Sequence, residues 1–364
     1  MAAQEPEPFH RALERALERA LASGDGVADH RFVDLPANEP PWADTGLEVR
    51  DGDQITIVRH GRSSLAGTSL WLEAGFNVWA RVGGRGPLER GTRATHTFRA
   101  VRDGTVQLGN AQPAEWTDRD GAIEDDPGVY ALMEGGAEAL LIRWADGADP
   151  LEALRGAAER SADPWGYLAG EVARLEYGLG APPPGWEHLW FLGPSEVFTR
   201  SGDVLDCVTR GDAAIICHDA AFDLGDDTVL EWSWRVDALP SLQPEDALET
   251  HDYLSLAVEF DDGQDLTYHW SAGLPAGTSY RCPLPHWSAR ETHLVLGSGP
   301  EGLGHWHNEA RHLRSDYARA IGGTTPARVT RIWLIALSAM QHLEGRGAYR
   351  GITLRNDSQV LGVV

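Results

Sequence analysis

Short stretches of alternating apolar and polar residues dominate the second half of the chain. In Leu230–Val236 a leucine, two tryptophans and a valine share one face, and Glu, Ser and Arg share the other. Tyr253–Phe260 repeats this pattern, with Leu254, Leu256 and Val258 on the apolar face. A period of two with one apolar face is typical of a strand buried on one side. These stretches predict a sandwich whose mixed faces point outward or line a concavity.

The polar face of this region contains most of the candidate chemistry. The turn Asp261–Gly263 precedes another β-type segment, Leu266–Trp270, so the chain predicts a hairpin here. Pairing of its strands would place the following polar-face residues side by side: Tyr253, Ser255, Glu259, Thr267 and His269.

Residues 1–30 are expected to form an N-terminal segment with an amphipathic helix at positions 8–22. Apolar side chains recur at every fourth position from Phe9 to Leu21, with glutamates and arginines elsewhere. Such a helix either covers the body of its own chain or offers its apolar face to a partner. Both interpretations stay open, and the second makes a homo-oligomer a candidate assembly.

Residues 31–145 predict a β-sandwich or jelly roll, because short β-type segments alternate with Asp-Gly and Gly-Gly turns. The expected strands are Gly46–Arg50, Gln54–Arg59, Phe76–Val82, Thr95–Ala100, Gly104–Leu108 and Val129–Arg143. Residues 146–184 instead contain two short helical patterns, each preceded by an Asp-Pro pair, and we expect a helical linker. A second sandwich follows over residues 185–364, so the predicted fold class is mainly β.

The charge of the chain limits its partners. Asp and Glu number 55 against 31 Lys and Arg, and the formal net charge of −24 opposes binding to nucleic acid or an anionic membrane. All 31 basic residues are arginine, which excludes a Schiff-base lysine and a P-loop lysine. The N-terminal segment has no signal-type apolar core, and no run of about 18 apolar residues occurs. We therefore expect a cytoplasmic protein.

The stretch from Pro40 to Ala122, which includes VRDGDQITIVRHGR and THTFRAVRDGTVQLGN, resembles the galactose-binding-like sandwich of the PA-IL family of bacterial lectins. In that family a calcium ion and a sugar are held by a loop that matches Asn110–Gly121 here. The sugar-contacting tyrosine of the family falls near Leu65. The resemblance implies a lectin-like fold for this region.

The matching loop departs from the lectin pattern at its calcium positions. Ala111 stands where the family has an aspartate, and Asp118 and Arg119 stand where it has an asparagine pair. An arginine would repel a cation that requires oxygen ligands, so no tight calcium site is expected. Either a different cation site or a solvated acidic loop would use the remaining carboxylates: Asp118, Asp120, Glu124, Asp125 and Asp126.

Five motifs follow one another from Gly185 onward: GWEHLWF at 185–191, LEWSWRVDALP at 230–240, DLTYHWSAGLPAGTSY at 265–280, GHWHNEARHLRSDYARAIGG at 304–323 and TRIWLIAL at 330–337. In these motifs the chain is similar to the DUF3047 family of bacterial proteins. The resemblance implies a sandwich of jelly-roll or lectin type, with a helix at Glu309–Ala320. It transfers no established chemistry.

Three residues are candidates for acid/base catalysis without a cofactor: Glu259, His269 and Tyr253. A carboxylate, an imidazole and a phenol that converge on a concave sheet can transfer protons, as in a lyase, hydratase, isomerase or hydrolase. No GxSxG elbow or HExxH helix accompanies them. The alternative is an ordinary polar outer face of a sandwich.

Five further residues are candidates for ligand binding: Arg235, Ser255, Trp270, Tyr280 and Trp287. Both tryptophans lie next to turns or loops, where an aromatic ring can stack on a sugar or an apolar ligand.

The metal-binding patterns of the sequence are weak. His305 and His307 are two positions apart, as in a strand-borne metal site, but Glu309 onward predicts a helix that would direct the ligands apart. The three cysteines form no CxxC pair, and Cys282 has no base beside it in the sequence. We therefore expect neither a metal nor a cofactor.

Together these patterns predict a protein that recognises a glycan or small molecule on its C-terminal sandwich. Acid/base catalysis at this site stays open, as does the alternative of a non-catalytic lectin-like or assembly module. A deep pocket around the three candidate catalytic residues would favour an enzyme, and a shallow groove lined by tryptophan would favour a binding protein.

Overall fold

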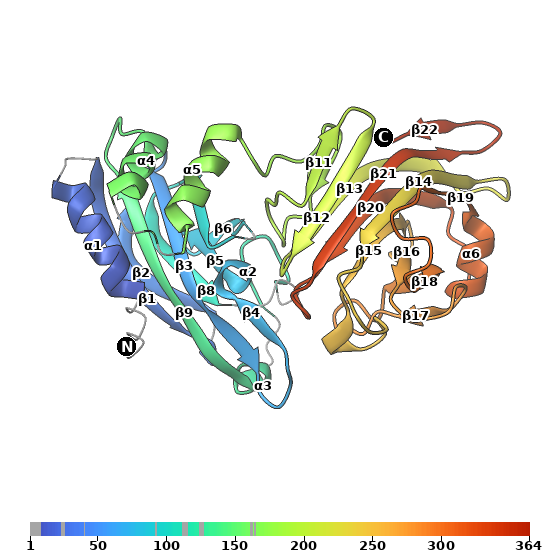
Figure 1. Cartoon of the computed structure of the whole chain (residues 1–364), viewed down its shortest axis with the longest axis horizontal. Coiled ribbons are helices and arrows are strands. Elements are labelled where there is room, and N and C mark those ends of the chain that lie inside the picture. The colour runs from blue at the N-terminus through green and yellow to red at the C-terminus, as the bar shows by residue number, and fades with distance from the viewer. Residues whose placement is uncertain are drawn as a thin grey trace. The chain divides into compact units, whose positions relative to one another are not determined.

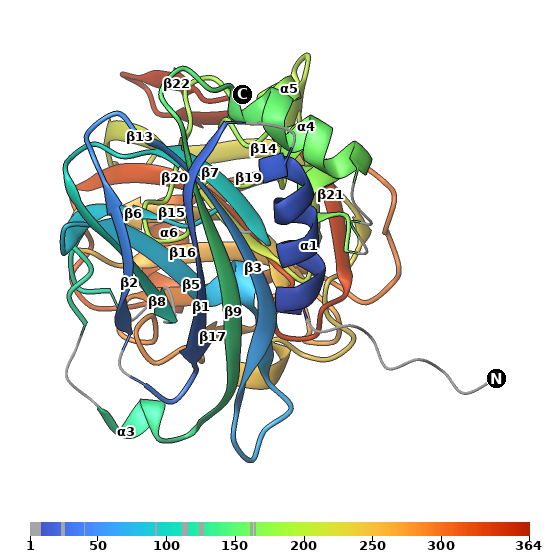
Figure 2. The ribbon, with the colours of Figure 1, turned by 90° about the vertical axis from the view of Figure 1, so that its left-hand side faces the viewer.

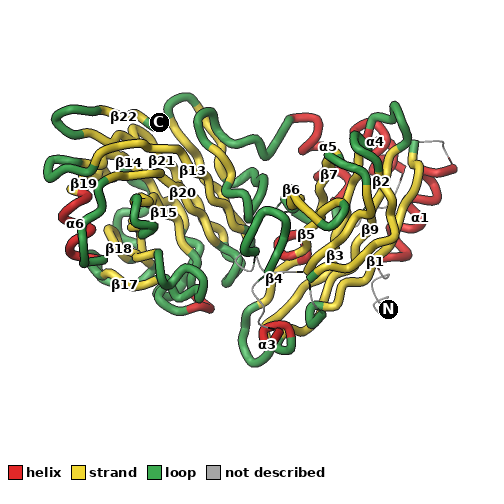
Figure 3. The backbone as a smooth tube through the Cα atoms, turned by 180° about the vertical axis from the view of Figure 1, so that it is seen from behind, coloured by secondary structure: helices red, strands yellow, loops and turns green. Residues whose placement is uncertain are grey.

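The computed structural model describes residues 9–22, 26–39, 41–91, 93–110, 116–123, 127–160, 163 and 165–364. The chain divides into two compact units, Met1–Gly180 and Ala181–Val364. Strands dominate both units (Figures 1 and 3), and the predicted fold class of β-sandwich domains is confirmed. Within the described ranges, no helix is long and apolar enough to cross a membrane.

The N-terminal unit contains two sheets and a layer of helices. The five-stranded sheet has the order β1-β9-β3-β4, with β7 paired to β3. Its strands are β1 (Val27–Pro36), β3 (Gln54–Leu65), β4 (Trp71–Glu73), β7 (Thr95–Arg99) and β9 (Met133–Trp144). The four-stranded sheet has the order β2-β8-β5-β6, with β2 (Trp42–Val49), β5 (Val78–Val82), β6 (Arg85–Glu89) and β8 (Gly104–Asn110). The helices are α1 (Phe9–Ala22), α2 (Ala74–Asn77), α3 (Pro127–Tyr130), α4 (Pro150–Arg160) and α5 (Tyr167–Tyr177).

Strand β9 explains this layered arrangement, because it is apolar on both faces. Ala139 and Leu141 belong to the core between the two sheets, whereas Leu140 and Ile142 belong to a second apolar cluster. Helices α1, α4 and α5 complete that second cluster with the side chains Phe9, Leu13, Ala153, Leu154, Ala157 and Leu168. Figure 2 shows α1 lying along this sheet.

The first half of the apolar face of α1 therefore covers its own unit. Phe9 and Leu13 are 2% and 3% exposed. The side chains of Leu17 and Leu21 lie outside the described residues, and the predicted homo-oligomer stays a prediction.

The C-terminal unit is a two-sheet sandwich. The seven-stranded sheet has the order β10-β13-β20-β15-β16-β18-β17. Its strands are β10 (Glu187–His188), β13 (Ala213–Asp223), β15 (Tyr253–Phe260), β16 (Asp265–Ser271), β17 (Ser279–Arg281), β18 (Glu291–Ser298) and β20 (Arg328–Leu337). The second sheet has the order β11-β12-β21-β14-β19, with β22 paired to β21. Its strands are β11 (Phe198–Ser201), β12 (Val204–Arg210), β14 (Val229–Ala238), β19 (His307–His312), β21 (Glu344–Arg355) and β22 (Val360–Gly362); helix α6 is Leu313–Ala320.

The alternation seen in the sequence accounts for the core of this sandwich. Leu254, Leu256 and Val258 of β15 and the two tryptophans of β14 belong to one buried cluster. The predicted hairpin is also confirmed: β15 and β16 pair antiparallel, and the backbone N–H of Phe260 donates to the carbonyl of Gln264 at 2.9 Å.

One predicted helix is shorter than expected. The segment expected to be helical from Glu309 begins as strand β19, which pairs with β14 so that Trp232 lies opposite Glu309. Helix α6 begins only at Leu313. Pairing with a strand distant in sequence therefore overrides the local helical pattern.

Candidate functional site

The face of the seven-stranded sheet that points away from the core is polar across three strands. Because side chains alternate along β15, Tyr253, Ser255 and Glu259 leave the core together. The neighbouring strands continue this face in register. One row contains Ala257, Thr267 and His293, and the next contains Glu259, Asp265 and Glu291.

One part of this face is a buried group that we call the histidine cluster: Tyr253, Thr267, His269, Glu291 and His293 from the sheet, with His251, Tyr280 and Cys282. His251 follows a 3-10 helix at Leu248–Thr250, and Tyr280 and Cys282 lie in and after β17. Tyr280 is half-buried, and every other member is buried. Segments outside β15, β16 and β18 therefore close over a face that the sequence predicts to be open.

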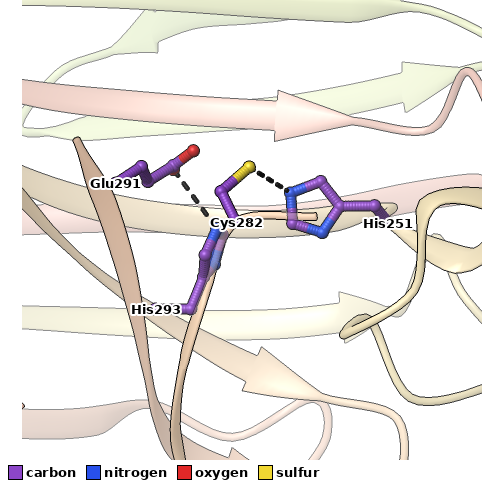
Figure 4. Close-up of side chains that lie close together, drawn as sticks. All are labelled: His251, Cys282, Glu291 and His293. Carbon is purple, nitrogen blue, oxygen red and sulfur yellow. Dashed lines mark hydrogen bonds and ion pairs between the residues drawn. The ribbon is translucent and has the colours of Figure 1, made fainter. Parts of the chain in front are cut away.

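Glu291 is the centre of the cluster. Its Oε1 accepts hydrogen bonds from the Tyr253 hydroxyl at 3.2 Å and the Thr267 hydroxyl at 2.9 Å. The Nε2 of His293 lies 3.3 Å from the same oxygen (Figure 4). Burial alone would raise the pKa of Glu291, but electrostatic attraction to the His293 ring beside it holds that pKa below the usual range. Glu291 is therefore ionised at neutral pH.

Cys282 lies against His251 in the same cluster. Its Sγ is 3.2 Å from His251 Nε2, while His251 Nδ1 donates to the backbone carbonyl of Glu245 at 2.6 Å. Burial, with a smaller contribution from the neighbouring His293, lowers the pKa of His251 to about 3. Burial also raises the pKa of the Cys282 thiol. The expectation that Cys282 has no base beside it is therefore wrong, and the pair is a neutral imidazole facing a thiol.

Two of the predicted catalytic residues belong to this cluster. Tyr253 is 3% exposed and His269 is fully buried. His269 Nε2 lies 3.2 Å from the Tyr280 hydroxyl, and the Tyr280 ring stacks on His293 with centroids 4.9 Å apart. Burial raises the pKa of Tyr253 well above its usual value and lowers that of His269 well below. Both side chains are therefore neutral at physiological pH.

The predicted ligand residue Ser255 shares this environment. It is fully buried and lies opposite His269 across the β15–β16 pair. The structure thus brings together four of the predicted residues: Tyr253, Ser255, His269 and Tyr280.

The third predicted catalytic residue, Glu259, has different partners. Its Oε2 accepts a hydrogen bond from Trp333 Nε1 at 3.0 Å and lies 3.6 Å from Arg331 Nη1. Its Oε1 is 4.0 Å from Arg290 Nη2. The Arg290 guanidinium lies 5.0 Å from the ring centre of Trp287, which meets the Trp333 ring edge-on at 6.2 Å.

We call this group the Trp287 surface: Glu259, Trp287, Arg290, Arg331 and Trp333, with Phe191 beside Trp287. The side chains of Arg290 and Arg331 are 35% and 45% exposed, and that of Glu259 is 16% exposed. Unlike the histidine cluster, this surface is partly exposed to solvent, through its two arginines and the predicted ligand residue Trp287, while Trp333 is buried.

Two predicted ligand residues lie elsewhere. Trp270 is 5% exposed in the core, because strand alternation turns it away from His269, and its Nε1 donates to the carbonyl of Gly299. Arg235 lies on β14 in the other sheet, where it pairs with Asp237 and lies over the Trp306 ring. The prediction of a ligand-contacting Trp270 at a rim is therefore wrong, and Arg235 is not part of the same face.

The side chains in the sequence patterns considered for metal binding form hydrogen bonds with backbone groups. His305 and His307 direct a ring nitrogen to the carbonyls of Leu303 and Gly302, respectively. In the acidic loop, Asp118 accepts two backbone N–H bonds, and Asp120 accepts one from Gly86. Ala111 and Glu124–Asp126 lie outside the described residues.

Sequence reasoning missed His251 as a member of the site. It stands two positions before Tyr253, so the strand period would have placed it on the same polar face. An open cavity of about 440 Å³ also occurs in this unit. It is lined by residues that include Asp262, Arg281 and Tyr317, and by none of the predicted site residues.

Fold and site define a two-sandwich protein with a buried polar cluster and an open aromatic surface on one sheet. Residues 184–353 match the model of a family described as a protein of unknown function, DUF3047. The family match therefore lies in the C-terminal unit, where the sequence motifs indicated it. No curated protein matches the chain.

Several solved structures are similar to parts of the chain. The N-terminal domain of EclA, a PllA-like lectin, is 14% identical and covers 31% of this chain and 95% of its own, with a TM-score of 0.24. The xyloglucanase domain of NopAA from Sinorhizobium fredii is 5% identical and covers 49% and 95%, with a TM-score of 0.31. An exo-beta-agarase is 9% identical and covers 50% and 24%, with a TM-score of 0.27.

Proposed function

We propose that the C-terminal unit recognises a carbohydrate through the Trp287 surface. The observation that carries this proposal is the placement of Glu259. Its carboxylate lies among one indole N–H and two guanidinium groups, and the indole of Trp333 and the guanidinium of Arg290 both contact the partly exposed ring of Trp287.

This combination suits the two kinds of surface that a sugar presents. Aromatic rings pack against the apolar C–H face of a pyranose, and a carboxylate accepts hydrogen bonds from its hydroxyl groups. The guanidinium groups of Arg290 and Arg331 add donors, and both side chains are more than one-third exposed, at 35% and 45%. Carbohydrate is also the ligand class of the lectin and xyloglucanase structures named above, but the proposal rests on the residues.

Binding is favoured over cofactor-independent acid/base catalysis. Tyr253 and His269 are buried, and Glu259 is held by Trp333, Arg331 and Arg290 rather than by either of them. A shared substrate would have to reach both the partly exposed carboxylate of Glu259 and two buried side chains. The lectin-like alternative predicted from the sequence does not require a ligand to reach the buried Tyr253 and His269.

The test is an oligosaccharide array probed with the full-length protein, followed by calorimetry with the best-bound oligosaccharide. Trp287→Ala should weaken binding about tenfold or more, since an aromatic contact buried by a ligand contributes about 1.5–3 kcal/mol. Trp306→Ala is the matched control. It removes a partly exposed tryptophan that also lies under an arginine, Arg350 at 4.0 Å, but on the other sheet.

The control variant should bind like the parent. The proposal fails if the array shows no bound oligosaccharide. It also fails if Trp306→Ala abolishes binding while Trp287→Ala leaves it intact.

A further inference from the structure

We propose that His251, Cys282, Glu291 and His293 bind one divalent transition-metal ion, of which zinc fits best, in a closed structural site. This inference concerns the buried histidine cluster and does not depend on carbohydrate binding at the Trp287 surface. Figure 4 shows the four side chains converging from three separate segments of the chain.

The spacing of four ligand atoms, one from each residue, is compatible with a tetrahedral site. One ligand atom from each residue lies within 4.8 Å of the other three. Metal distances of about 2.0–2.3 Å place tetrahedral ligand atoms roughly 3.3–3.8 Å apart. One separation already lies in this range, 3.3 Å between Glu291 Oε1 and His293 Nε2, and another lies just below it, 3.2 Å between Cys282 Sγ and His251 Nε2. Small side-chain rotations would bring the two pairs around one ion.

The donor set matches the chemistry of zinc. Two imidazoles, one thiolate and one carboxylate are all ligands that zinc takes in proteins. Deprotonated Cys282 and ionised Glu291 would balance the two positive charges of the ion, which allows the site to be buried. All four positions come from the protein, and Cys282 is 1% exposed. The site is therefore structural rather than an open catalytic centre.

Hydrogen bonds from neighbouring groups orient the proposed ligand side chains, as they do in known metal sites. His251 Nδ1 donates to the Glu245 carbonyl at 2.6 Å, which leaves the lone pair of Nε2 directed at Cys282. Tyr253 and Thr267 both donate to Glu291 and hold its carboxylate in place. Hydrogen bonds of this kind set the tautomer and direction of ligating side chains.

His293 supplies an independent reason to invoke an ion. It is fully buried, and neither of its ring nitrogens makes a hydrogen bond among the described residues; the Glu291 contact is an ion-pair approach only. Buried polar atoms are nearly always satisfied in native proteins, because leaving one unpaired costs free energy. A metal bond to His293 would satisfy one of the two nitrogens.

The test begins with the unmodified full-length protein. Elemental analysis after expression in zinc-supplemented medium should find about one zinc ion per chain. After chelation, titration with Co²⁺ alone should produce visible bands of a tetrahedral site together with a sulfur-to-cobalt charge-transfer band.

Variants then assign the thiolate. Cys282→Ser should remove the charge-transfer band and weaken Co²⁺ binding at least tenfold. Cys217→Ser, which changes a half-buried cysteine on β13, should leave both unchanged. Tyr253→Phe removes one orienting hydrogen bond and should weaken metal binding about 10–100-fold.

The parent protein alone can overturn the proposal, whether or not a variant folds. Absence of stoichiometric zinc together with failure to bind Co²⁺ would overturn it. Retention of the charge-transfer band in Cys282→Ser would overturn the assignment of these ligands.

Discussion

Replacing Glu259 by glutamine separates the stability of the Trp287 surface from its role in binding. The substitution keeps the size of the side chain and removes its charge. The Trp333 Nε1–H bond, 3.0 Å long with the carboxylate, can be kept because the amide oxygen of glutamine also accepts. The change therefore removes only the two ion pairs with Arg290 and Arg331.

Those ion pairs are weak by their geometry. They measure 4.0 and 3.6 Å, and the two arginine side chains are 35% and 45% exposed. Pairs that solvent screens to this extent contribute about 0–1 kcal/mol. Hydrogen bonds from ligand hydroxyls to a carboxylate contribute more, about 1.5–3 kcal/mol. Glu259→Gln should therefore change the free energy of unfolding by less than about 1 kcal/mol and weaken oligosaccharide binding about tenfold or more.

The assay combines urea unfolding with calorimetric titration of the best-bound oligosaccharide. Asp219→Asn is the control, since it removes another carboxylate that pairs with Arg331, at 3.2 Å, but that is 88% exposed. The control should bind like the parent. Parent-like affinity in a stably folded Glu259→Gln protein would refute the assignment of Glu259 as a ligand contact.

Two further substitutions test the fold around these surfaces. Leu256→Ala removes a fully buried side chain from the sandwich core and should lower the free energy of unfolding by about 2–5 kcal/mol in a urea titration; a loss below about 1 kcal/mol would contradict its core position. In the N-terminal unit, burial opposes ionisation of Glu171, but Arg174 and hydrogen bonds from Thr97 and Thr95 lower its pKa. A lowered pKa stabilises the fold above the pKa of the unfolded chain, so Glu171→Gln should cost about 1–3 kcal/mol at pH 7. That difference from the parent should shrink as the pH falls below about 4, and a difference independent of pH would contradict it.

Strand periodicity was sufficient to predict the C-terminal sandwich, because its information is local. Leu254, Leu256 and Val258 reveal their common face within one strand, and the Asp261–Gly263 turn reveals the hairpin partner. Elements stabilised by distant partners were harder to predict. Strand β19 begins in a sequence with a helical pattern, and only its pairing with β14 explains its extended form.

The candidate site could likewise be predicted only where the relevant information is local in the sequence. The hairpin places Ser255 opposite His269, as the sequence indicated. The parallel pairing of β16 with β18 has no turn signal, although it brings His293 beside Thr267. Burial was also invisible, because the cover comes from segments before β15 and around β17. The sequence therefore indicated which residues share this face, but neither the segments that cover it nor its division into two groups.

The segment between Cys282 and Glu291 connects the two proposed sites through the chain. Both of its ends are proposed metal ligands, and Trp287 and Arg290 lie between them. Backbone hydrogen bonds already shape the segment, with Cys282 N–H donating to Glu291 and Glu291 N–H donating to Trp287. An ion would fix both ends of this short loop and thereby restrict the position of the Trp287 ring. The reverse dependence is weaker, because the Trp287 ring contacts Phe191, Trp333 and Arg290. Trp287 contacts Glu291 only through its backbone carbonyl, which a side-chain substitution keeps. Loss of the ion can therefore weaken oligosaccharide binding, whereas loss of Trp287 should leave metal content unchanged, so failure of either proposal can be recognised separately.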